Sequence, residues 1–225
     1  MTRPRRRETA SSSSSSDHPR HHDDESHIIS SPSLLFSLTP RVCGLSVRCE
    51  AALNAQIEKE QDASALYEAM HAFFGRAAVA LPGFAALFAR ASDEERGHAR
   101  RLMEHVNVRG GRVRLQRTSA WSPFFEPEVG SGSGDAALLA MKTAMDVERA
   151  NFRALVDLRA LAEREGDACL SDFLGEALLT EQVRDMYDLA LDLSRLTRLC
   201  GDGGVAAEFG VQQFDRALLE KYGGS

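Results

Sequence analysis

The chain has 225 residues, of which 43% are hydrophobic and 27% charged, which is typical of a globular protein with one full hydrophobic core. Its net charge of −6 disfavours nucleic acid as a partner, and no apolar run reaches the ~20 residues of a membrane-spanning helix, so we expect no membrane partner. Four cysteines without a CxxC pair argue against a disulfide scaffold or a zinc ribbon.

Residues 1–49 differ in composition from the rest of the chain. They carry seven arginines and five acidic residues, a net of +2, together with twelve serines and four histidines. A segment of this kind buries too little apolar surface to fold by itself. Basic, serine-rich leaders are typical of organelle import peptides, and Val47-Arg48-Cys49 resembles a plastid processing site. We therefore expect 1–49 to be a transit peptide or N-terminal extension, and 50–225 to be the folded domain. The predicted location is the chloroplast, with mitochondrion and cytoplasm as alternatives.

Apolar residues at alternating three- and four-residue steps predict a first helix from about 50 to 79. Pro82 suits the first turn of a second helix, which the Gly110-Gly111 pair ends. A long connection over 112–134 leads to a third helix, for which Asp135 is the expected N-cap.

A fourth helix is expected over about 168–199 and a short fifth over 205–220. The connections within the first pair and within the second pair of long helices are short, so each pair should be antiparallel. The predicted fold is all-α: a four-helix bundle with a long crossover between its second and third helices and a short C-terminal helix.

Each of the four long helices carries a metal-capable polar residue within its apolar stripe. These residues are Glu60 and Tyr67 on the first helix, Glu95 and His98 on the second, Glu148 on the third and Gln182 on the fourth. Burying one unpaired carboxylate costs several kcal/mol, and several together must take up protons or bind cations. No Lys or Arg lies on these stripes. A pair of divalent metal ions is therefore the favoured interpretation, and boundary residues on separate helices are the alternative.

Carboxylates with one imidazole suit a first-row divalent metal such as iron. Glu95 and His98 are three residues apart and point into one site. The third helix reads Glu148-Arg-Ala-Asn151 and the fourth reads Glu181-Gln182-Val-Arg184, so neither supplies a second histidine. One metal position would have three ligands and the other fewer, an asymmetry that suits a metal which leaves as product.

Several segments resemble the ferritin family. They are Leu53-Asn-Ala-Gln-Ile57 with Glu60 and Tyr67, Asp93-Glu-Glu-Arg-Gly-His-Ala99, Asn107-Val-Arg-Gly-Gly-Arg112, Val147-Glu148-Arg149 and Glu181-Gln182-Val183. Gly134-Asp135-Ala136 and Gly210-Val-Gln-Gln-Phe-Asp215 resemble plant and algal ferritins in particular. The likeness covers about residues 50–220 and implies the ferritin-like form of the bundle.

The resemblance also implies a function, iron storage and detoxification. A ferroxidase of this family oxidises Fe(II) to Fe(III) with O2 at a di-iron site and stores it as ferric mineral inside a 24-subunit cage of identical chains. Iron is then both substrate and cofactor. By position, Glu60, Glu95 and His98 would hold the first iron, while Glu95 and Glu148 would hold the second. Gln182 would lie near the second iron, Glu94 would be an accessory carboxylate, and Tyr67 would hydrogen-bond near the first iron and donate an electron.

Three departures from the family pattern concern iron entry and mineral growth. In the three-fold channel Asp172 is kept, Gly175 replaces its acidic partner, and Glu176 is the expected substitute. Arg159 stands where a histidine is frequent near that channel. Gly97 and Arg100 replace acids that are often used for mineral nucleation.

Other functions remain as alternatives. A di-iron carboxylate oxidase or peroxidase acting on an organic substrate would favour a second histidine ligand, and a purely structural cage subunit would lack the ligand set. A haem-binding relative would use Met70 or Met103, although methionine is more commonly a core residue.

Overall fold

The computed structural model describes residues 44–115, 125, 127, 132–201 and 204–224, all within one compact unit that begins at Pro40. Most of the predicted import segment and of the long connection lie outside the described residues. The helices are α2 (Val47–Phe74), α3 (Pro82–Val108), α4 (Ser133–Arg164), α5 (Ala168–Leu174), η1 (Gly175–Leu179), α6 (Thr180–Cys200) and α7 (Val205–Tyr222). The described ranges hold no strand, so the all-α prediction is confirmed.

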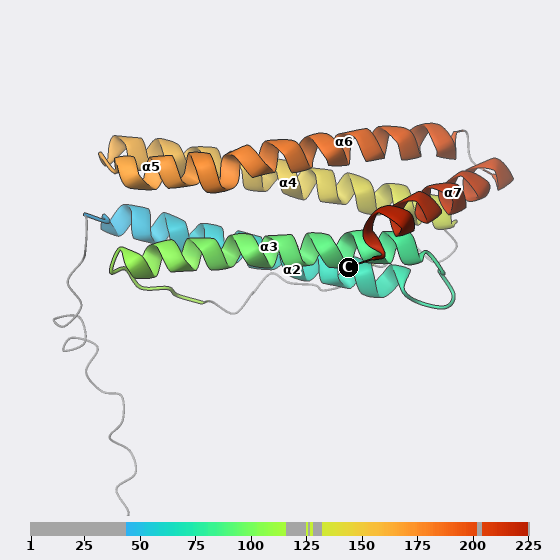
Figure 1. Ribbon diagram of the computed structural model, residues 1–225, viewed down its shortest axis with the longest axis horizontal. Helices are drawn as coiled ribbons and strands as arrows, with labels where there is room; N and C mark the ends of the chain where they lie inside the picture. Colours follow the sequence, from blue (N-terminus) through green and yellow to red (C-terminus); the bar gives the residue numbers. More distant parts are fainter. Residues whose placement is uncertain (1–43, 116–124, 126, 128–131, 202–203, 225) are drawn as a thin grey trace, which may run out of the picture. The chain divides into compact units, whose positions relative to one another are not determined.

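The long helices pack as two antiparallel pairs (Figure 1). Helix α2 lies along α3, and α4 lies along the helix that α5, η1 and α6 make together; contacts between α2 and α4 join the pairs. Helix α7 crosses one end of the bundle, where it contacts α3, α4 and α6. The four-helix bundle with a short C-terminal helix is therefore confirmed. No helix in the described part of the chain is long and apolar enough to cross a membrane.

Two predicted helix boundaries are wrong. Helix α2 ends at Phe74 rather than near 79, because residues 75–80 form the turn that reverses the chain, with Ala80 at a φ of 53° just before Leu81 and Pro82. Helix α4 begins at Ser133 with Gly132 as its N-cap, so Asp135 is not the cap. Asp135 lies in the first turn instead, where its negative charge interacts favourably with the helix dipole.

The fourth long helix contains one irregular turn that the periodicity did not predict. Residues Gly175–Leu179 form a π-helical turn between α5 and α6, and the Thr180 hydroxyl donates to the Gly175 carbonyl at 2.8 Å. Single π turns of this kind are frequent at functional sites. This one lies immediately before Glu181 and Gln182.

The hydrophobic interior is divided into two clusters along the bundle. One cluster is built around Phe74, Phe84 and Phe88 near the α2–α3 turn, and the other around Ile57, Leu102 and Leu174 nearer the opposite end. On each long helix the predicted carboxylate, imidazole or amide residues fall between members of the two clusters, whereas Tyr67 belongs to the first cluster. A polar layer therefore separates two apolar cores in the middle of the bundle.

Candidate metal centre

Six of the predicted site residues are buried: five form the polar layer, and Tyr67 donates a hydrogen bond to one of them, Glu148. Their exposed fractions are 0% for Glu60, 1% for Tyr67, 3% for Glu95, 3% for His98, 8% for Glu148 and 1% for Gln182. They come from α2, α3, α4 and α6, so all four long helices contribute. The helical stripes therefore identified the side chains that share this depth of the bundle.

Glu60, Glu95 and His98 form the tightest group. One ligand atom from each side chain lies within 4.8 Å of the other two. His98 Nδ1 is 3.6 Å from Oε1 of Glu95, whereas its buried Nε2 has no hydrogen-bond partner among the described residues and lies 3.9 Å from Oε2 of Glu181. Two carboxylates and an imidazole at these separations match the donors that divalent first-row metals prefer.

The electrostatics of this group favour either a proton or a cation. Burial, with help from neighbouring Glu95, raises the pKa of Glu60 well above its usual value. Burial also raises the pKa of Glu95 to about 8, and Glu148 and Glu94 add to the shift. A carboxyl group with a pKa of about 8, as Glu95 has, holds its proton at neutral pH unless a cation replaces it.

Glu148 forms a second group with Tyr67 and Gln182. The Tyr67 hydroxyl donates to Oε1 of Glu148 at 2.5 Å, and the Gln182 amide donates to the other oxygen. Burial raises the pKa of Glu148 and, well above its usual range, that of Tyr67. The tyrosine contacts the carboxylate assigned by resemblance to the second iron, although the resemblance implied a position near the first.

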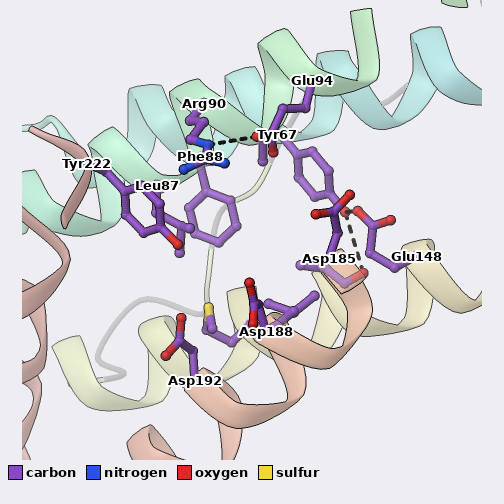
Figure 2. Close-up of a pocket in the computed structure, with 14 residues that line it drawn as sticks. Tyr67, Leu87, Phe88, Arg90, Glu94, Glu148, Asp185, Asp188, Asp192 and Tyr222 are labelled. Atoms are coloured by element: carbon purple, nitrogen blue, oxygen red, sulfur yellow. Dashed lines mark hydrogen bonds and ion pairs between the residues drawn. The ribbon is translucent and has the colours of Figure 1, made fainter. Parts of the chain in front are cut away.

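A pocket opens beside Glu148 and Tyr67, toward α6 and α7 (Figure 2). Glu94 lines it but is not buried, because its side chain is 40% exposed and pairs with Arg90 at 2.6 Å. Asp185 lines the pocket near Glu148, and burial together with Glu94 and Glu181 raises its pKa. Glu94 thus lies at the edge of the polar layer, and Asp185 is an acidic neighbour that the sequence reasoning missed.

Sequence reasoning also missed two amides that contact the carboxylates. Gln56 Nε2 donates to Oε1 of Glu60 at 2.7 Å, and Asn151 Nδ2 lies 3.0 Å from Oε2 of Glu60. Both are buried, with exposed fractions of 2% and 4%. Their spacing was a usable signal, since Gln56 precedes Glu60 by one helical turn and Asn151 follows Glu148 by one turn.

The predicted channel residues lie away from this layer. Asp172 on α5 and Glu176 on η1 are both exposed. The Arg159 guanidinium occupies the space beside Gly175, where the Cβ of any larger residue would come within 3.5 Å of it. A Cβ at Gly97 would meet nothing within 4 Å, and Arg100 lines a groove between α2 and α3.

The geometry is that of a buried, acid-rich cluster in a helical bundle, with donor atoms of the kind that cations take. Residues 50–199 match the family model described as a ferritin-like domain. The chain belongs to the ferritin family.

Ferritins of plants and algae are among its relatives. Ferritin-2, chloroplastic, of Nicotiana tabacum is 40% identical over 176 residues, covering 78% of this chain and 64% of that protein. Ferritin-3, chloroplastic, of Arabidopsis thaliana is 41% identical over 175 residues, covering 77% of this chain and 63% of that protein. The match thus spans slightly less than two thirds of these ferritins.

A solved structure shows the same fold. The ferritin of the green alga Ulva pertusa has a TM-score of 0.71 and 40% sequence identity to this chain, covering 81% of this chain and 88% of the algal one. The resemblance to plant and algal ferritins is therefore confirmed in both sequence and fold.

Proposed function

We propose that this ferritin is a ferroxidase that oxidises Fe(II) with O2 and stores the ferric product as a mineral. The observation that carries the proposal is the convergence of Glu60, Glu95 and His98 within 4.8 Å in a buried layer. An uncompensated cluster of this kind costs stability, and divalent cations offset that cost. Two ferrous ions would each give up one electron, and O2 would take up both electrons with two protons to give hydrogen peroxide.

The side chains divide between two iron positions. Glu60, Glu95 and His98 would hold the first ferrous ion, and Glu95 and Glu148 would hold the second. Gln182 orients Glu148 through its amide, and Tyr67 donates a hydrogen bond to the same carboxylate. Glu94 lines the pocket that opens beside Glu148. Its proposed role is that of an accessory ligand, which binds iron on its way to or from the second position.

The storage role requires a closed shell, and we propose that 24 identical chains assemble into one. Asp172 and Glu176 remain the proposed acidic residues of the ion channel. Arg159 beside Gly175 places a positive charge close to them, which would slow the entry of cations.

We also propose that the protein acts in the chloroplast, as the names of its relatives indicate for those proteins. The N-terminal segment keeps its proposed role as a transit peptide or extension, but the boundary expected between residues 49 and 50 falls inside α2 (Val47–Phe74). Ser46 caps the start of α2 and Cys49 is fully buried. Both observations favour processing upstream of Ser46 rather than directly after Cys49.

The test is the rate of Fe(II) oxidation in air by the purified protein and by a Glu60→Ala/His98→Ala variant. We expect the fast ferric absorbance of the native protein to disappear in the variant, because the first iron position loses two of its three ligands. Glu104→Ala is the matched control, since Glu104 is an exposed acid on α3 and should leave the rate unchanged.

Particle size is measured on the same samples, so that loss of the site is distinguished from loss of assembly. A variant that assembles like the native protein and oxidises iron equally fast would contradict the site. A native particle of only one or two subunits would contradict the storage role. Oxidation of an organic substrate in preference to iron would favour the alternative, a di-iron oxidase or peroxidase.

A further inference from the structure

Asn151 is a buried amide in the polar layer that faces two of its carboxylates. It lies on α4, one turn beyond Glu148, and only 4% of its surface is exposed. Its Nδ2 is 3.0 Å from Oε2 of Glu60 and 3.5 Å from Oε2 of Glu95. One amide nitrogen from α4 therefore faces carboxylates that come from α2 and α3.

An amide suits the position beside the Glu60 and Glu95 oxygens better than an aliphatic or a positively charged side chain does. An aliphatic side chain would leave two buried carboxylate oxygens without this donor, which costs free energy. A lysine or arginine would satisfy the oxygens, but its positive charge would repel an incoming cation. The amide donates two hydrogens without adding charge.

Hydrogen bonding by Asn151 is compatible with metal binding by the same carboxylates. A carboxylate has about four lone-pair sites on its two oxygens. Oε1 of Glu60 already accepts from Gln56 at 2.7 Å, so Asn151 and Gln56 together hold both ends of this carboxylate. The rotation of Glu60 is thereby restricted while lone pairs remain for a cation.

We propose that Asn151 is a positioning residue of the iron site, which sets the separation of Glu60 and Glu95 before a divalent cation binds. This inference rests on the proposed ferroxidase function. Because Asn151 acts on the ligands rather than on O2, its loss should weaken cation binding more than it slows the turnover of bound iron.

The experiment replaces Asn151 in the full chain and uses Co(II) as a redox-stable probe beside the Fe(II) oxidation assay. Asn151→Leu removes the donor at similar volume, whereas Asn151→Ser keeps a short one. Loss of a residue that orients metal ligands typically costs tenfold to a hundredfold in affinity, so we expect Asn151→Leu to weaken Co(II) binding by about that factor. KM for Fe(II) should rise in parallel, kcat should change little, and Asn151→Ser should recover part of the loss.

Ser92→Ala is the matched control, because it removes a different buried contact, the hydrogen bond of 2.8 Å from Ser92 to the Ser64 carbonyl between α2 and α3. It should leave the Co(II) spectrum and KM unchanged. If Asn151→Leu does not fold, the comparison rests on Asn151→Ser, which should then show a smaller rise in KM.

Two results would overturn the proposal: unchanged Co(II) affinity and KM in soluble Asn151 variants, or equal effects in Ser92→Ala. A native protein that binds Co(II) but oxidises no iron would instead contradict the ferroxidase function, and the Co(II) comparison would still test Asn151.

Discussion

Glu60 has no exposed surface, yet its two oxygens accept hydrogen bonds from the neutral amides of Gln56 and Asn151. Neutral donors lower the cost of burying a carboxylate without cancelling its charge. The positive charge must then come from a proton or from a bound cation. A proton and a bound cation can therefore replace one another at the Glu60 carboxylate.

This exchange predicts how divalent cation binding depends on pH. Glu95 has its pKa raised to about 8, and Glu60 and Glu148 shift in the same direction. Zn(II), a redox-inert probe, must therefore displace protons at neutral pH. We expect its affinity to rise between pH 6 and pH 8, with more protons released per ion at the lower pH, as measured by calorimetry in buffers of different ionisation enthalpy.

The same pKa shift has a defined sign for the stability of the metal-free protein. The unfolded chain loses the Glu95 proton near the ordinary glutamate pKa of 4.5, whereas the folded chain keeps it to about pH 8. Stability from this group is therefore present at low pH and is lost as the pH rises through that window. An affinity for Zn(II) that does not change between pH 6 and pH 8 would contradict the assignment of these protons to the buried carboxyl groups.

Helix α3 begins with no side-chain cap from its own flanking residues. Asp215 of α7 supplies one, because its Oδ1 accepts from the Phe84 backbone N–H at 2.9 Å. Gly83 makes the approach possible, since a Cβ there would overlap the Asp215 carbonyl oxygen. A residue on the last helix therefore completes the start of the second long helix.

We predict that Asp215→Ala lowers the free energy of unfolding by about 1 kcal/mol, which is the typical cost of losing a helix cap. Asp215→Asn should retain part of the stability, because the amide oxygen still accepts. Denaturant unfolding checks both variants, with Glu220→Ala as the control for an exposed acid on α7. Equal stability of Asp215→Ala and the native protein would show that the cap contributes nothing.

The helices also show which features of the fold and the site the sequence pattern predicts and which it does not. A periodic stripe identifies which side chains share a face, so Glu60, Glu95 and Glu148 were found from spacing alone. It does not show which side chain of a stripe reaches a carboxylate on another helix, so the donors Gln56 and Asn151 were missed although each lies one turn from a predicted ligand. The π turn at Gly175–Leu179 was missed because the extra residue leaves the apolar pattern on either side intact. The end of α2 was placed too late because Gly75, the C-cap residue, was not used as a stop signal.

At the scale of the whole folded unit, the interior is two apolar cores with a polar, acid-rich layer between them. Each core supplies hydrophobic burial, and the layer opposes it while the carboxylates lack a cation. We therefore expect cations to bind in the middle of the bundle. The bundle and the last helix followed from patterning, whereas the contact of α7 with α3 did not.

The most direct test of this claim is anomalous X-ray diffraction from crystals of the protein soaked with Zn(II). We expect two peaks inside the bundle, one among Glu60, Glu95 and His98 and the other beside Glu148. Peaks confined to exposed surface residues, with the interior empty at saturating zinc, would contradict it.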